Sequence, residues 1–467
     1  MTYSSKLTME VGDKPREACG VFGIWQDAPK ALGSTAYLAL LGLQHRGQDG
    51  AGIAIYNSYE NNFVIQKDLG LVDDVFADGR HLEGLPQGQI AIGHNSYSTS
   101  GAKDNFEGLQ PLHSLTAGKQ LVLAHNGHID ELSGLPTGET DTQVLVEMIS
   151  EEMQEGLDVV YALKKVTDGM VNGAYSLVLS DGNRLVGMRD PRGFRPLMIG
   201  ENDSGYCLAS ESSALFATDF HPLRDVKPGE IVVIDEKGVE SIENTSGLTP
   251  KICGMEYAYF ARPDTNLDGI NIQMARERMG EILAKKEKDD FHPDMVVGVP
   301  DSGVPAAHGY AREIGIPLEQ ALVKNRYVTR TFIKNTQADR ERAVLTKLSP
   351  NEAIIDGKKL VIVDDSIVRG TTTKTLIAML KDAGAAEVHL RISWPPYKWP
   401  CYFGMDTGRP DELIASKMSE SEICEYIGAD SLKYISTDEV KEAIGSKDIC
   451  TACADGRYPS HRHQKES

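Results

Sequence analysis

The amino-acid sequence predicts two domains of different fold class, a layered α+β domain followed by a parallel α/β domain. The chain has 467 residues, which is enough for two or three domains. Short β-like runs with only a few helical patterns fill residues 19 to about 248, and this grouping favours a layered α+β fold. From about Lys251 onward, strands and helices alternate, which indicates a parallel sheet covered by helices. We place the boundary near Pro250.

The elements of the first half follow from short apolar runs and helical spacing. A hairpin turn is expected at residues 180–183 (SDGN). Strands are expected at residues 21–25, 52–56, 90–94, 121–125 and 174–180. Helices are expected at residues 35–43, 142–152 and 157–165.

The second half alternates more regularly. Strands are expected at residues 295–299, 360–363 and 388–392, with helices at Val304–Ile314 and about 371–383. Two capping boxes, Ser419 with Glu422 and Ser436 with Glu439, predict two C-terminal helices, which end at Gly428 and Gly445.

Composition argues against several classes of function. The formal net charge of −20 opposes nonspecific binding to nucleic acid. No run of eighteen apolar residues occurs, so no membrane span is expected. Residues 1–18 are polar and lack the apolar centre of a secretory signal, so we expect a cytoplasmic protein. Seven cysteines in a reducing compartment are more often catalytic or metal-binding than disulfide-bonded.

The most informative segment follows the strand at 360–363. It reads DDSIVRGTTTK from Asp364 to Lys374: two adjacent acids, then a loop that leads into a helix. Backbone N–H groups at a helix N-terminus bind phosphate, and paired carboxylates suit sugar hydroxyls or a hydrated Mg²⁺. The Gly-Lys-Ser/Thr spacing of a Walker A loop is absent. The segment resembles the phosphoribosyl-pyrophosphate loop of the type I phosphoribosyltransferases.

A second group of motifs indicates a glutaminase. Cys19 stands at the start of a predicted strand, where a cysteine taken alone is usually inert. However, QHRGQDGAG at residues 44–52 and HNG at residues 125–127 resemble the N-terminal-nucleophile glutaminases, or class II glutamine amidotransferases. With the phosphate loop, the chain from Cys19 to about Pro459 is identified as a member of the glutamine phosphoribosylpyrophosphate amidotransferase family, in its iron–sulfur and leader-peptide branch.

This resemblance implies an architecture and a reaction. Residues 1–18 would be a cleavable leader, residues 19–250 a four-layer αββα glutaminase domain, and residues 251–467 a type I phosphoribosyltransferase domain with cluster-bound C-terminal helices. The enzyme would make 5-phosphoribosylamine, pyrophosphate and glutamate from phosphoribosyl pyrophosphate and glutamine, the first step of de novo purine synthesis. A homotetramer and feedback inhibition by purine nucleotides are further implications.

The expected glutaminase chemistry depends on removal of the leader. A terminal Cys19 carries its own general base, the α-amine, whose reference pKa is about 7.7–8.0. By resemblance, Asn126 and Gly127 form the oxyanion hole and Asp141 holds the α-ammonium group of glutamine. The remaining glutamine-binding residues that the resemblance implies are Arg46, Ser96 and Thr99.

One position departs from the family pattern GHVRYST. Residues 93–99 read GHNSYST, so Ser96 stands where the family has the Arg that binds the α-carboxylate of glutamine. Arg offers a bidentate, charge-assisted contact, whereas Ser offers one neutral hydrogen bond. The loss amounts to about 2–4 kcal/mol of binding free energy. We therefore expect weakened glutamine use unless Arg46 or another cation compensates.

The acceptor site is expected at the phosphate loop and two other segments. PDSG at residues 300–303 resembles a family motif that makes Ser302 a Mg²⁺ or phosphate contact, although a helix N-cap would explain it too. The basic segment at residues 324–332 resembles the flexible loop that closes over pyrophosphate. The Mg²⁺ site would comprise Ser302, Asp364 and Asp365. Contacts to phosphoribosyl pyrophosphate would come from Lys324, Arg326, Arg330, Asp364, Asp365, Ser366, Arg369, Gly370, Thr371, Thr372 and Thr373. Tyr259 and Arg262 would face the ammonia path between the domains.

Four cysteines suggest a cofactor. Cys450-x-x-Cys453 alone is a weak metal signal, but Cys253 and Cys401 lie where the iron–sulfur branch of the family keeps ligands. Four thiolates suit a [4Fe–4S] cluster. A zinc site or unliganded thiols are the alternatives.

Two other functions stay open at this point. A phosphoribosyl-pyrophosphate-sensing regulator would keep the fold and lose turnover, although the basic loop and the Asp364–Asp365 pair argue against it. An ammonia-dependent enzyme, or one that uses another amide, would keep the transferase and explain Ser96.

Overall fold

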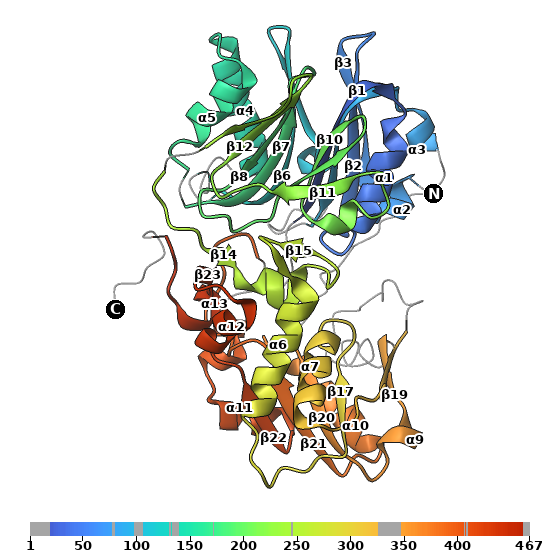
Figure 1. The fold of residues 1–467 in the computed structure, drawn as a ribbon, viewed down its shortest axis with the longest axis vertical. Coiled ribbons are helices and arrows are strands. Elements are labelled where there is room, and N and C mark those ends of the chain that lie inside the picture. Colours follow the sequence, from blue (N-terminus) through green and yellow to red (C-terminus); the bar gives the residue numbers. More distant parts are fainter. Residues whose placement is uncertain are drawn as a thin grey trace, which may run out of the picture.

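The computed structural model describes residues 19–76, 80–97, 106–129, 132, 140–170, 172–243, 246–325, 347–405, 407 and 410–460. The expected leader at residues 1–18 lies outside these ranges, and so do Thr99, Arg326 and Arg330. Figure 1 shows two domains stacked along the long axis, with strands β1 to β12 in the upper one and the elements from α6 onward in the lower one.

The first domain contains two antiparallel sheets. The larger sheet has seven strands in the order β11-β9-β10-β1-β4-β2-β3, and the smaller has six in the order β13-β12-β8-β7-β6-β5. The larger sheet comprises β1 (Gly20–Lys30), β2 (Gly50–Asn57), β3 (Asn62–Leu69), β4 (Gly88–Ser96), β9 (Met198–Asn202), β10 (Gly205–Ala209) and β11 (His221–Asp225). The smaller comprises β5 (Leu112–Thr116), β6 (Lys119–His128), β7 (Ala174–Ser180), β8 (Leu185–Arg189), β12 (Ile231–Asp235) and β13 (Gly238–Ile242).

Alternation along β1 explains how the layers of this domain form. Phe22 and Ile24 point to the outer face and pack with the helices α1 (Leu32–Gly42) and α2 (Val72–Phe76). Val21 and Trp25 point the other way and pack against the smaller sheet. Helices α4 (Asp141–Gln154) and α5 (Val159–Thr167) cover the opposite face of that sheet. The predicted four-layer αββα arrangement is confirmed, and a short helix α3 (Arg80–Glu83) follows α2.

The second domain is built on a four-stranded parallel sheet in the order β17-β20-β21-β22. The strands are β17 (Met295–Gly298), β20 (Lys359–Asp364), β21 (Glu387–Ile392) and β22 (Ser431–Tyr434). Helices α6 (Ile272–Lys285), α7 (Val304–Ile314) and α12 (Thr437–Ile444) pack on one face. Helices α10 (Thr371–Asp382) and α11 (Glu420–Ile427) pack on the other. The predicted parallel α/β class is confirmed.

Local sequence patterns predicted the positions of most helices and strands correctly. The five strands expected in the first half fall within β1, β2, β4, β6 and β7, and both predicted capping boxes begin α11 and α12. The sequence patterns missed α6 and the short elements α9 (Glu352–Ile355), β15 (Asn266–Leu267), β16 (Ile270–Asn271), β18 (Leu322–Lys324) and β19 (Leu348–Pro350). Within the described ranges, no helix has both the length and the apolar character that a bilayer crossing requires.

The C-terminal tail returns to the start of the second domain. Strand β23 (Ile449–Cys450) pairs in parallel with β14 (Ile252–Cys253), with Cys253 opposite Cys450. Helix α13 (Ala452–Asp455) follows β23, and a π-helix, Glu256–Phe260, follows β14. Two segments almost 200 residues apart in the sequence therefore bring three cysteines to the boundary between the domains.

Candidate functional site

The thiol of Cys19 lies at the end of the larger sheet. Cys19 is buried and immediately precedes β1, with a backbone φ of 67°. Its Sγ lies 3.9 Å from the carbonyl oxygen of Tyr97, just beyond the end of β4. His94 on β4 donates from Nε2 to the carbonyl oxygen of His125 at 3.1 Å. This contact joins the end of the larger sheet to β6, next to Asn126.

Asn126 combines a buried, unpartnered side-chain amide with a neighbour, Gly127, whose backbone conformation favours glycine. The Asn126 side chain is fully buried, and neither its Oδ1 nor its Nδ2 has a hydrogen-bond partner among the described residues. A buried polar group without a partner carries a free-energy cost and calls for an explanation such as a ligand. Gly127 has a φ of 138°, and a Cβ there would lie 1.9 Å from the carbonyl oxygen of Ala174. Only glycine therefore fits at position 127.

Asp141 lies close to the same end of β6. It is the first residue of α4, which begins after a capping box at Thr140. Its Oδ2 accepts a hydrogen bond from the backbone N–H of Ile129 at 3.0 Å, and its Oδ1 accepts from the N–H of Thr142 at 2.8 Å. The side chain keeps 19% exposure, so the carboxylate remains accessible to a cationic ligand.

Ser96 offers no cation at the position where the family has Arg. Its hydroxyl donates to Nδ1 of His94 at 3.1 Å, because Nε2 of that ring is the donor to His125. Burial lowers the pKa of His94 to about 3, so the imidazole is neutral at physiological pH. The Ser96 proton is thus already engaged, and the side chain has only lone pairs to offer a ligand.

Arg46 pairs with two buried carboxylates. Its guanidinium is fully buried, with Nη2 2.8 Å from Oε1 of Glu256 and Nη1 in contact with Oε1 of Glu211. Arg195 also reaches Glu256, at 3.4 Å between Nη1 and Oε1. Glu211 and Glu256 thus hold the guanidinium of Arg46 in a buried charge network that also includes Arg195. Sequence reasoning missed this network because its members are far apart in the chain.

The acceptor-site residues gather at the carboxyl ends of β17 and β20. Strand β20 ends at Asp364, and both Asp364 and Asp365 are buried. The hydroxyls of Ser302 and Ser366 donate to the two oxygens of Asp365. Val299 N–H donates to the carbonyl oxygen of Val363 at 2.9 Å, which holds the two loops side by side. Neighbouring parallel strands thus bring Ser302 to the carboxylate pair.

The predicted phosphate loop leads directly into a helix. Gly370 precedes α10, and Thr371, Thr372 and Thr373 form its first turn, where backbone N–H groups point outward. Arg369 pairs with Glu412, at 2.6 Å between Nη2 and Oε2.

The basic loop and the expected ammonia path are only partly described. Lys324 is half-exposed at the end of β18 and contacts Asp301. Arg326 and Arg330 lie outside the described residues. Tyr259 lies in the π-helix, and Arg262 pairs with Asp264 while its N–H donates to Glu211 at 3.0 Å. Both residues belong to the segment that joins the two domains.

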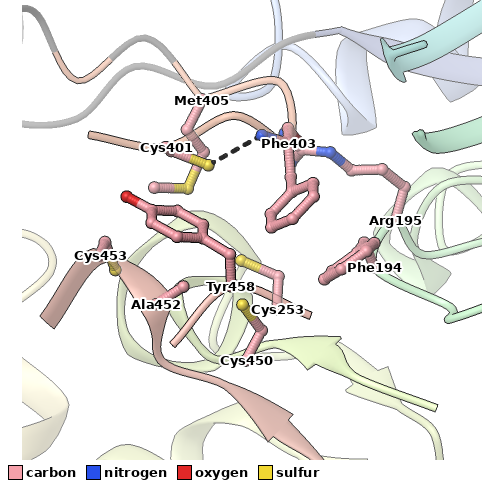
Figure 2. A pocket seen from close by; sticks show the side chains of 10 residues that line it. All are labelled: Phe194, Arg195, Cys253, Cys401, Phe403, Met405, Cys450, Ala452, Cys453 and Tyr458. Atoms are coloured by element: carbon pink, nitrogen blue, oxygen red, sulfur yellow. Dashed lines mark hydrogen bonds between the residues drawn. The ribbon is translucent and has the colours of Figure 1, made fainter. Parts of the chain in front are cut away.

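A cavity at the domain boundary is lined by the four predicted ligand cysteines. Cys253, Cys401, Cys450 and Cys453 face it together with Phe194, Arg195, Phe403, Met405, Ala452 and Tyr458. Figure 2 shows the four sulfur atoms arranged around the same space. Backbone N–H of Phe403 donates to Sγ of Cys401 at 3.3 Å. The remaining cysteines, Cys207 and Cys424, lie in hydrophobic cores away from this cavity.

The cavity disfavours free thiolates. Burial raises the pKa of all four thiols, that of Cys450 to about 12, so without a cation they remain protonated. Within the described part of the chain, no three His, Cys, Asp or Glu side chains form a group that could hold a metal ion. The four thiols thus line one cavity without forming such a group.

Comparison with known protein families defines the class of the molecule. Residues 94–217 match the glutamine amidotransferase domain family, and residues 267–411 match the phosphoribosyl transferase domain family. The chain is thus a transferase that couples a glutamine amidotransferase domain to a phosphoribosyltransferase domain.

Full-length relatives identify the family. The chain is 42% identical to amidophosphoribosyltransferase from Synechococcus elongatus, over 97% of this chain and 93% of the relative. It is 42% identical to the Methanocaldococcus jannaschii enzyme (95% and 98%) and 41% identical to the Bacillus subtilis enzyme (96% and 95%). The chain belongs to the amidophosphoribosyltransferase family.

Solved structures agree with this assignment. The structure of an allosteric regulatory enzyme of purine biosynthesis superposes with a TM-score of 0.87 at 40% identity, over 96% of this chain and 98% of that one. The glutamine phosphoribosylpyrophosphate amidotransferase of B. subtilis, complexed with ADP and GMP, gives a TM-score of 0.84 at 39% identity, with the same coverage. The predicted fold and the predicted function, amidophosphoribosyl transfer in purine synthesis, are confirmed.

Proposed function

We propose that the two domains carry out two half-reactions, with ammonia released at Cys19 and consumed at the Asp364–Asp365 site. The observation that carries this proposal is the buried, unpartnered side-chain amide of Asn126 beside Gly127. This is the arrangement that a developing oxyanion requires, because preorganised donors need no reorganisation during the reaction.

In the first half-reaction, Sγ of Cys19 attacks the amide carbon of glutamine, and the α-amine of Cys19 accepts the thiol proton. The oxygen of the tetrahedral intermediate accepts hydrogen bonds from the Asn126 side chain and the Gly127 backbone N–H. Collapse of the intermediate breaks the C–N bond, and the leaving nitrogen takes the proton from the amine and departs as ammonia. Water then hydrolyses the thioester to glutamate, while Asp141 holds the α-ammonium group.

This step requires that residues 1–18 be removed, because an acylated nitrogen cannot act as the base. We therefore propose that the mature chain begins at Cys19. Intact-mass measurement of purified protein tests this. A fully active chain that still carries residues 1–18 would contradict the terminal-nucleophile mechanism.

In the second half-reaction, ammonia attacks C1 of phosphoribosyl pyrophosphate and pyrophosphate leaves. The first turn of α10 would bind the 5-phosphate, and Lys324, Arg326 and Arg330 would bind the leaving pyrophosphate. Asp364 and Asp365 would hold the ribose hydroxyls and, with Ser302, a hydrated Mg²⁺. That donor set fits, because Mg²⁺ in such sites takes one or two carboxylates and otherwise water and phosphate oxygens. Bound there, Mg²⁺ would neutralise charge on the leaving pyrophosphate.

The four cysteines around the boundary cavity fit a [4Fe–4S] cluster. The thiols come from three segments that are far apart in the sequence: Cys253 from β14, Cys401 from a loop, and Cys450 and Cys453 from the tail. The cluster would supply metal–ligand bonds that tie the tail and the loop to the domain boundary.

The contacts of Ser96 and Arg46 favour an enzyme that uses glutamine weakly. Ser96 donates its proton to a neutral His94, and Arg46 is neutralised by two carboxylates. No cation from these positions then balances the α-carboxylate of glutamine. We also propose, from the family and from the relative complexed with ADP and GMP, that purine nucleotides inhibit a homotetramer of this chain.

Formation of phosphoribosylamine with glutamine and with ammonium, measured on anaerobically purified protein, tests the proposal. We expect activity with both donors, higher with ammonium, and release of one pyrophosphate per product. Absence of pyrophosphate release with both donors would contradict the proposed enzymatic function and favour a phosphoribosyl-pyrophosphate-sensing regulator.

A further inference from the structure

The loop that carries Cys401 makes an unexpected contact with the glutaminase domain. Gly404 has a φ of 86°, and a Cβ placed on it would lie 3.1 Å from the carbonyl carbon of Gly127 and 3.2 Å from the backbone nitrogen of His128. The same Cβ would lie 2.9 Å from Nη2 of Arg195. The backbone of Gly404 therefore rests directly on the peptide that follows the proposed oxyanion hole.

Gly127 needs such support because its own conformation is permissive. Its φ of 138° lies in a region that glycine enters and leaves easily, so the peptide on either side can rotate unless its surroundings hold it. One side is held by β7, where Gly127 pairs with Tyr175. Gly404 covers the peptide that joins Gly127 to His128.

The loop of residues 401–405 is itself firmly anchored. The ring of Phe403 stacks on Phe194 with 4.4 Å between centroids, and Arg195 donates from Nη2 to the carbonyl oxygen of Phe403 at 2.8 Å. Figure 2 shows the Phe403 ring facing Phe194, with Arg195 beside them. Phe194 and Arg195 belong to the first domain, so the loop bridges the two domains immediately behind Gly127.

We infer that Gly404 is a positioning residue for glutamine hydrolysis: its backbone, in a loop of the transferase domain, packs on the Gly127–His128 peptide and thereby fixes the position of Gly127, whose own N–H, on the preceding peptide, is a donor of the proposed oxyanion hole. This inference rests on the proposed role of Asn126 and Gly127. It makes the glutaminase site dependent on a loop that also provides Cys401 to the boundary cavity.

The test compares three full-length variants, purified anaerobically. Gly404→Ala adds a methyl group that displaces either the Gly127–His128 peptide or Arg195. Gly445→Ala is the matched control, because Gly445 has nearly the same φ, 84°, but nothing within 4 Å of its Cβ position. Asn126→Ala removes the side-chain donor and tests the oxyanion hole itself.

We expect Gly404→Ala to lower kcat for glutamine hydrolysis at least tenfold, and by no more than the 10²–10³-fold that loss of one oxyanion-hole donor costs. Three other measurements should stay within about twofold of their values in the unaltered protein, because none of them depends on the oxyanion hole. These are KM for glutamine, the rate of ammonia-dependent transfer, and the rate at which iodoacetamide alkylates Cys19. Gly445→Ala should leave all four measurements unchanged.

Three results would overturn the inference. The first is a Gly404→Ala enzyme that hydrolyses glutamine as the Gly445→Ala enzyme does, although Asn126→Ala is impaired. The second is a loss of ammonia-dependent transfer in parallel, which would indicate general damage. The third is an Asn126→Ala enzyme that hydrolyses glutamine normally. This result would contradict the proposed oxyanion hole, and with it the inference that depends on that hole.

A further variant tests the inference if Gly404→Ala does not fold. Phe403→Leu loosens the loop by removing the stack on Phe194 without adding bulk at position 404. A selective fall in kcat for glutamine hydrolysis would then support the inference, and an unchanged kcat would overturn it.

Discussion

Replacement of Glu211 by Ala should destabilise the protein through its domain boundary. The side chain is fully buried in the first domain, where Oε1 lies 2.8 Å from Nε2 of His45 and contacts Nη1 of Arg46. Its Oε2 accepts hydrogen bonds from Arg262 N–H at 3.0 Å and from the Thr265 hydroxyl at 2.8 Å, both on the segment that leads into the second domain. One carboxylate thus joins the two domains.

The magnitude follows from the loss of a buried charge partner. Removing one member of a buried ion pair costs about 3–5 kcal/mol, because the remaining charge is left without compensation. For domains of this size each kcal/mol lowers Tm by about 2–4 °C, so Glu211→Ala should lower Tm by about 6–20 °C. Differential scanning calorimetry measures this.

The control is an exposed ion pair. Glu243 lies 3.0 Å from Lys227, and both side chains are about two-thirds exposed. Glu243→Ala should change Tm by less than about 2 °C, because exposed pairs contribute little. Equal shifts for Glu211→Ala and Glu243→Ala would refute the reasoning.

The same residue predicts a pH dependence. Burial alone would raise the pKa of Glu211, but the charges of His45 and Arg46 and the hydrogen bonds it accepts lower its pKa below the ordinary 4.5. A carboxyl group with a depressed folded-state pKa stabilises the protein above its unfolded pKa, and this contribution is lost as pH falls through the folded value. The difference in Tm between the unaltered protein and Glu211→Ala should therefore be constant above about pH 5 and shrink below about pH 4.5.

Three further predictions concern the separate sites. Ser96→Arg should raise kcat/KM for glutamine at least tenfold, about 1.4 kcal/mol, with ammonia-dependent transfer unchanged; an efficient unaltered glutaminase that Ser96→Arg does not improve would mean that another cation binds the carboxylate. Asp365→Asn should nearly abolish transfer with either nitrogen donor and leave glutamine hydrolysis intact, and a folded variant that loses both activities would contradict separate sites. Cys253→Ser should lose the iron that we expect at about four atoms per chain, whereas Cys424→Ser, outside the cavity, should keep it; equal iron contents would exclude the cavity as the cluster site.

Local patterns predicted most of the architecture. The short apolar run in β1, the capping boxes of α11 and α12, and the acid-rich segment after β20 each depend on neighbouring residues, which the sequence displays directly. Long-range pairing left no such signal. The pairing of Arg46 with Glu211 and Glu256, 165 and 210 residues away, could not be predicted from neighbouring residues.

The cavity was predictable only in part. Resemblance to the family selected the four cysteines that line it, but no sequence pattern indicated that Phe194, Arg195 and Phe403 complete its wall. The contact of Gly404 with Gly127 is invisible in the sequence for the same reason, since two glycines 277 residues apart have no side chains through which a pattern could arise.

The most direct test of two coupled sites is a comparison of nitrogen donors in Cys19→Ala protein. Ammonium-dependent formation of phosphoribosylamine should match that of the unaltered protein, because the acceptor site lies in the other domain. Glutamine-dependent formation should fall to background, because the nucleophile is gone. A Cys19→Ala protein that still uses glutamine, or one that is folded and has lost ammonium-dependent transfer as well, would contradict the account.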